Sequence, residues 1–87
     1  MVAKRYNEPI ELTISADRQP KEFCWRGKQY RVESVIKRWT VNDEWWRQMG
    51  TRRFHAVVSA RLHSQVGQYE LVYEIGRRQW FLRSVFD

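Results

Sequence analysis

Apolar residues alternate with other residues along most of the chain, with a period of two. The pattern is clearest from Phe54 to Leu62, where Ala56, Val58 and Ala60 complete one apolar series. Successive side chains of a β-strand point to opposite faces, so this period predicts a strand with one buried face. The alternation recurs along the chain and predicts six strands, over residues 8–15, 21–26, 29–40, 51–64, 68–75 and 79–86.

Short connections separate most of these strands, and three of them contain a glycine. Gly27, Gly67 and Gly76 lie in the predicted turns, and residues 17–20 also have turn chemistry. Glycine readily takes the positive φ that tight hairpin turns require. Neighbouring strands are therefore expected to pair antiparallel.

Two of the predicted strands are long enough that they must bend. About a dozen residues at roughly 3.3 Å each would span about 40 Å, which exceeds the width of a domain of this size. In the third strand the apolar phase runs through Tyr30 and Val32 and then slips to Val35. This slip predicts a β-bulge near Ser34.

Together these strands predict a mainly β fold in a single domain over residues 1–87. The expected architecture is a strongly curved antiparallel meander of about six strands, which can close into a small barrel and so hide its edges. Trp25, Trp39 and Trp80 are expected to be largely buried. Residues 1–6 carry little that can pack and are expected to be loose.

Residues 42–49 depart from the period of two and predict one short helix between strands three and four. Asn42 or Asp43 can cap its start, and Gly50 follows its end. A helix of about two turns is not stable alone, so Trp45, Trp46 or Met49 is expected to dock on the sheet.

Charge narrows the range of functions. Sixteen Lys and Arg against ten Asp and Glu leave a net charge of +6, with one excess between Lys37 and Arg61 and a second cluster at Arg77, Arg78 and Arg83. Arginine binds phosphates and aromatic rings stack on bases. The first segment combines both, which predicts binding of DNA that is single-stranded or read without sequence choice. The predicted contact residues are Lys37, Arg38, Trp45, Arg47, Arg52 and Arg53.

A structural role for the same residues stays open. The tryptophans of this segment can form a core under the short helix, with the arginines as a solvated face that covers the rings. Of these tryptophans, Trp45 is expected to be the most exposed, because adjacent helix residues point about 100° apart.

Catalytic and metal chemistry have little support in the sequence. His55 or His63 of strand four and Glu70 or Glu74 of strand five can lie across from each other, which favours a structural cross-strand pair over an acid–base site. His55 and His63 are eight residues apart on one strand, about 26 Å at full extension, too far for one ion. Cys24 is the single cysteine, so no internal disulfide forms. We expect no catalytic residue, no cofactor and no metal.

The apolar runs are too short for a membrane-spanning helix, which needs about 20 residues. The first ten residues also lack the apolar centre of a signal peptide. We therefore expect a cytoplasmic protein with no membrane partner.

Three parts of the chain also carry the pattern of a known family. They are Arg5-Tyr6 with Glu8-Pro9-Ile10; Phe23-Cys24-Trp25-Arg26-Gly27-Lys28-Gln29-Tyr30 with Val32, Val35, Arg38, Trp39 and Trp45-Trp46; and Tyr69-Glu70-Leu71 with Gly76, Trp80, Leu82, Arg83, Val85 and Asp87. Over nearly its whole length the chain resembles a small bacterial domain family of unknown function. Members of that family are encoded beside, or fused to, translesion DNA polymerases of the Y family and their mutasome partners.

The resemblance implies a setting in DNA repair but transfers no activity and no site. The leading hypothesis is a non-enzymatic accessory module of translesion synthesis that binds DNA through residues 37–53. The alternative is a protein-interaction domain that contacts a translesion polymerase subunit through an exposed strand edge or the Trp45 region. A third class is a barrel that holds a small molecule inside, although the aromatic residues are expected to fill the interior.

Overall fold

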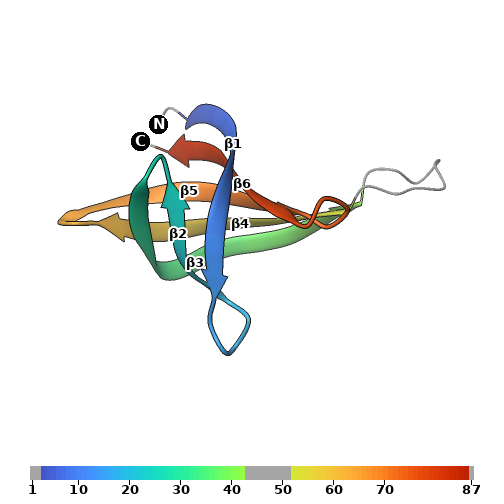
Figure 1. The fold of residues 1–87 in the computed structure, drawn as a ribbon, viewed down its shortest axis with the longest axis horizontal. Helices are drawn as coiled ribbons and strands as arrows, with labels where there is room; N and C mark the ends of the chain where they lie inside the picture. The colour runs from blue at the N-terminus through green and yellow to red at the C-terminus, as the bar shows by residue number, and fades with distance from the viewer. Residues whose placement is uncertain (1–2, 43–51, 87) are drawn as a thin grey trace.

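The computed structural model describes residues 3–42 and 52–86, and in these residues it is a closed antiparallel barrel of six strands (Figure 1). Each strand pairs with the next along the chain, and the first pairs with the last. The predicted six-stranded antiparallel meander is confirmed, and the sheet closes into a ring. The strands are β1 (Ala3–Ile14), β2 (Pro20–Trp25), β3 (Lys28–Asn42), β4 (Arg52–Leu62), β5 (Gln65–Glu74) and β6 (Gln79–Phe86).

The N-terminal residues take part in closing the ring. Ala3, Lys4 and Arg5 pair with the end of β6, and the ring of Tyr6 packs edge-on against Trp25 at 5.1 Å between centroids. The expectation that residues 1–6 carry little that can pack is therefore wrong for residues 3–6. The described ends of the chain consequently lie side by side (Figure 1).

The short helix predicted for residues 42–49 is not seen. The part of the chain that the structure describes contains no helix, and residues 43–49 lie outside it. Asn42, one of the two proposed caps, is the last residue of β3 and pairs with Arg52 of β4, and Asp43, the other, lies outside the described residues. Strand pairing thus occupies the backbone where the helix was expected to begin.

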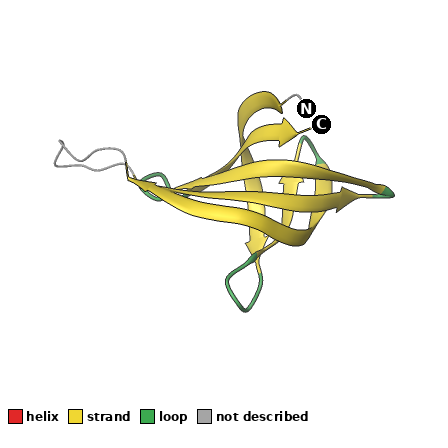
Figure 2. Cartoon of the chain, turned by 180° about the vertical axis from the view of Figure 1, so that it is seen from behind, coloured by secondary structure: helices red, strands yellow, loops and turns green. Residues whose placement is uncertain are grey.

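Two β-bulges bend β3. Its pairing with β4 skips Glu33 and again skips Ile36, which confirms the predicted bulge near Ser34. Its first residues pair with β2 as far as Arg31, and the remainder runs on beside β4. Seen from behind, β3, β4 and β5 run side by side as one long wall (Figure 2).

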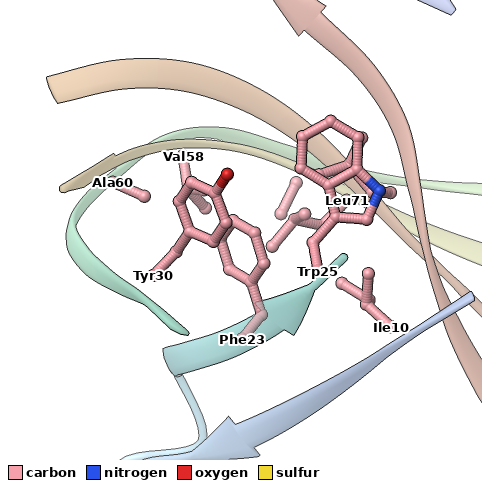
Figure 3. Packing of buried hydrophobic residues seen from close by; sticks show 9 residues of the cluster. Ile10, Phe23, Trp25, Tyr30, Val58, Ala60 and Leu71 are labelled. Atoms are coloured by element: carbon pink, nitrogen blue, oxygen red, sulfur yellow. The ribbon is translucent and has the colours of Figure 1, made fainter. Parts of the chain in front are cut away.

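Aromatic residues fill the barrel. The rings of Phe23 and Tyr30 stack at 4.9 Å, and Trp25 lies beside them above Ile10 (Figure 3). Phe23 is completely buried, and burial of Tyr30 raises the pKa of its phenol above the ordinary value. This packing follows from the alternation, since these residues occupy one face of each strand.

Only one of the three tryptophans expected in the core is buried. Trp25 is 9% exposed, whereas Trp39 and Trp80 are half-buried. Trp80 lies at the end of the core against Phe54 and Tyr73, with ring centroids 6.1 and 5.1 Å away. Trp39 points outward instead, because its pairing partner His55 alternates with the buried Ala56.

Candidate functional site

A row of apolar and aromatic side chains crosses the outer face of the sheet from β3 to β6. Trp39 of β3 pairs with His55 of β4, His55 with Val72 of β5, and Val72 with Phe81 of β6. The chain neighbours of these residues on β4, β5 and β6 are the buried Ala56, Leu71 and Leu82. The alternation therefore turns the row outward. We call Trp39, His55, Val72 and Phe81 the outer row.

A buried contact between a histidine and a glutamate supports the outer row at Trp39. Nδ1 of His55 lies 3.0 Å from Oε2 of Glu70, and His55 is only 5% exposed. The ring of Trp39 stacks on the imidazole at 5.0 Å, with 12° between the planes. The predicted meeting of a β4 histidine with a β5 glutamate is confirmed for His55 and Glu70, but the pair lies under an indole rather than in solvent. This contact holds the imidazole on which the ring of Trp39 stacks.

A pocket of about 370 Å³ opens at the other end of the outer row. It includes Val72 and Phe81, so the pocket and the row are continuous. It lies on the outside of the barrel, because its strand residues occupy the outward phase, and the buried Val72 forms part of its wall. The lining residues are Asn7, Arg53, Val72, Glu74, Arg77, Phe81 and Arg83.

The pocket is cationic. Arg53 of β4, Arg83 of β6 and Arg77 of the β5–β6 turn converge there with a single carboxylate. That carboxylate belongs to Glu74, whose Oε1 lies 3.2 Å from Nε of Arg77. The lining therefore carries a formal excess of two positive charges, which suits an anionic ligand.

Paired irregularities in β1 and β6 bring two of these residues to the pocket. Tyr6 and Asn7 of β1 together lie opposite Arg83 of β6, because the pairing passes directly from Arg5–Ser84 to Glu8–Leu82. Asn7 has a left-handed φ of 55°, and asparagine tolerates this region better than most residues. A bulge redirects a side chain, so Asn7 and Arg83 both reach the pocket.

The structure separates the contact residues predicted from the sequence. Lys37 and Arg53 lie on the outer face, with Nζ of Lys37 5.2 Å from the ring centroid of Trp39 and Arg53 in the pocket. Arg38 and Arg52 belong to the opposite face, since Arg38 pairs with the buried Ala56. Nη1 of Arg38 donates to Oε1 of Gln19 at 2.8 Å. Trp45 and Arg47 lie outside the described residues.

The sequence did not indicate that the other residues of the pocket lie together. Arg77 and Arg83 formed a second basic cluster, but nothing joined them to Arg53 at a distance of more than 20 residues along the chain. Phe81 falls on the outward phase of β6 and gave no signal of function. The one usable clue is a slip of the apolar phase between Leu82 and Val85, with Arg83 between them.

The described residues were also compared with the requirements of a metal site and of a membrane-spanning helix. In residues 3–42 and 52–86, His, Cys, Asp and Glu side chains form no group of three that could hold a metal ion. Across the same residues there is no helix of the length and apolar character needed to cross a membrane.

Comparison with known proteins gives a family and little else. A family described as a domain of unknown function (DUF6504) matches residues 1–87. No curated protein and no solved structure matches the chain. The family description carries no link to translesion polymerases, so that part of the expectation stays a prediction.

Proposed function

The chain belongs to the DUF6504 family, which is defined without an activity, and we propose that it is a non-enzymatic module that binds single-stranded DNA on its outer row. The observation that carries the proposal is the placement of Trp39 and Phe81, two half-buried rings, on an outward face that also bears Lys37 and Arg53. Proteins that bind single strands combine stacking rings with a cationic groove in this way.

The net charge of +6 supports the same proposal, because a positive protein attracts a polyanion before contact. The indole of Trp39 is held in place by stacking on His55, which Glu70 holds in turn, and Nζ of Lys37 lies over the ring and would move aside for a base. A preformed platform avoids part of the ordering cost of binding. The setting that we propose is the cytoplasm, in DNA repair beside translesion synthesis, on the strength of the sequence resemblance.

The test is a titration of oligothymidine at several salt concentrations. Two phosphate contacts at about −0.7 each give a slope of about −1.4 in log affinity against log salt. Lys37→Gln and Arg53→Gln should each flatten that slope by about 0.7. Trp39→Leu keeps His55 covered but removes the aromatic face, and should weaken binding by about 1–3 kcal/mol with the slope unchanged.

Arg38→Gln and Arg52→Gln are matched controls, because they remove the same charge from the opposite face. The proposal predicts that both bind like the parent protein. Equal losses from all four charge variants would mean that net charge and not the outer row governs binding. No binding even in the millimolar range at low salt would overturn the proposal.

A protein-interaction role has one observation in its favour. In the described part of the chain, β3 pairs with β2 only from Lys28 to Arg31, so its later residues have β4 on one side only. Such an edge can accept an added strand from a partner. Capture of a translesion polymerase subunit by the Trp39→Leu and Arg53→Gln variants, without DNA binding by the parent protein, would favour this role.

A further inference from the structure

We propose that the pocket beside Phe81 binds a nucleotide that carries a terminal phosphate, and this proposal rests on the proposed function of the outer row. Phe81 and Val72 belong both to the outer row and to the pocket wall. A strand stacked along the row therefore leads into the pocket. The shared ligand chemistry is a phosphomonoester, whether on a strand end or on a free nucleotide.

The charge of the pocket matches this ligand. Arg53, Arg77 and Arg83 come from three separate segments, and Glu74 offsets one of them. The remaining excess of two positive charges equals the charge that a phosphomonoester approaches near neutral pH, whereas an internal phosphodiester carries one. Guanidinium groups also bind phosphate oxygens in pairs of hydrogen bonds.

The size and wall of the pocket fit one nucleotide. A volume of about 370 Å³ lies at the lower end of the range for small-ligand sites, roughly 300–1,000 Å³. Phe81 offers a ring face for a base, and the amide of Asn7 can both donate and accept a hydrogen bond. The bulges at Asn7 and Arg83 direct these two side chains toward the pocket, whereas regular pairing would direct them away from it.

The experiment compares oligothymidines of one length with a phosphate at the 5′ end, at the 3′ end or at neither. One phosphorylated end should bind about tenfold more tightly than the unphosphorylated strand, as charge-assisted hydrogen bonds are strong. Arg83→Gln and Arg77→Gln should each abolish this preference and leave the affinity of the unphosphorylated strand nearly unchanged. Arg77 is a turn residue with an exposed side chain, so its variant is expected to fold even where Arg83→Gln does not.

Arg61→Gln is the charge-matched control, since Arg61 lies on the outer face away from the pocket and pairs with Glu33. It should keep the preference for a phosphorylated end. Thymidine monophosphate and thymidine form a further arm. If the monophosphate binds, thymidine does not, and Arg83→Gln removes the binding, the pocket holds a free nucleotide, and the phosphomonoester assignment stands.

The outcomes separate the two proposals. Binding of all three oligothymidines with equal affinity, and no binding of thymidine monophosphate, would overturn the pocket assignment and keep the outer row. Failure of every oligothymidine while thymidine monophosphate still binds would overturn the outer row alone. Binding of an acidic peptide in place of any phosphate ligand would assign the pocket to a protein partner and overturn the nucleotide.

Discussion

Glu8 joins two neighbours through three hydrogen bonds. Its carboxylate accepts hydrogen bonds from Nε1 of Trp25 at 2.8 Å and from Nε and Nη2 of Arg26 at 3.0 and 2.8 Å. The guanidinium of Arg26 also lies 4.9 Å from the ring centroids of Tyr6 and Trp25. One carboxylate therefore ties the middle of β1 to the end of β2 and holds Arg26 over both rings.

This arrangement predicts a pH-dependent contribution to stability. The hydrogen bonds from Arg26 and then from Trp25 lower the pKa of Glu8 below its ordinary value of 4.5. A lowered folded pKa stabilises the native state above the ordinary pKa, and the contribution is lost as the pH falls through the folded pKa. Glu8→Gln should therefore reduce the free energy of unfolding near pH 7, and its difference from the parent should shrink below about pH 4.5.

Urea unfolding at a series of pH values measures this difference. Glu11→Gln is the matched control, because it removes an exposed carboxylate from the same strand. A deficit of Glu8→Gln that is as large at pH 3 as at pH 7 would contradict the prediction.

Within the strands, glycine serves packing as well as turns. Of the three predicted turns, only the one at Gly27 has a positive-φ glycine, where it follows Arg26 with φ of 74° and 53°. Gly67 lies inside β5 opposite Ala60, and the β4–β5 turn instead uses His63 with φ of 57°. Two consecutive positive φ values are the signature of the tight hairpin turn between β2 and β3.

Gly67→Ala should destabilise the sheet by about 1–3 kcal/mol, because an added Cβ overpacks the site. That Cβ would lie 3.0 Å from Oη of Tyr69, and the ring of Tyr69 packs edge-on against Phe23 and Tyr30 at 5.6 and 5.3 Å. The ring therefore has little freedom to move. Thermal unfolding and the near-ultraviolet circular dichroism of the tyrosines measure the effect.

Gly76→Ala is its control, since no atom lies within 4 Å of an added Cβ there. Tyr69→Phe in the Gly67→Ala background removes the closest contact and should recover part of the loss. Equal stability of Gly67→Ala and Gly76→Ala would refute the packing argument.

Closure of the barrel depends on the pairing of β1 with β6. Deletion of residues 1–6 would remove the pairs of Ala3, Lys4 and Arg5 and the contact of Tyr6 with Trp25. The loss should be on the order of 2–4 kcal/mol, the sum expected for a few backbone hydrogen bonds and one aromatic pair. Chemical unfolding of the shortened protein measures it.

The double variant Lys4→Ala/Arg5→Ala separates backbone from side-chain effects, because both side chains are exposed. It keeps the strand pairing and should remain as stable as the parent. A shortened protein that unfolds at the parent denaturant concentration would show that closure does not need these residues.

Much of the fold could be predicted from the sequence, because each strand is indicated by the alternation of apolar and polar residues within it. The period of two gave the strands and Trp25 of the core, and the slip after Val32 gave the bulge. The start of β1 could not be predicted in the same way, because Ala3–Tyr6 is held by backbone pairing to a strand about 80 residues away. The alternation of side chains within one segment does not indicate which distant strand that segment pairs with.

The candidate site was predictable only in part for a related reason. Lys37 and Arg53 were selected by local composition, and the structure keeps both on the outer face. Arg38 was selected by the same criterion, but adjacent strand residues face opposite ways, so it is separated from Lys37. The pocket depends on Asn7 and Arg83, whose meeting requires ring closure and a bulge, and neither is a property of one segment.

The pairing of β1 with β6 also sets the order in which the molecule can assemble during synthesis. Every other strand pair joins neighbours along the chain and can form as soon as the second strand has emerged from the ribosome. Residues 3–10 must wait for the last strand, so Ile10 and Tyr6 lack their β6 neighbours until then. A half-made chain is therefore an open sheet in which β1 has a free edge, prone to pair with another copy, and that edge is covered only when β6 arrives.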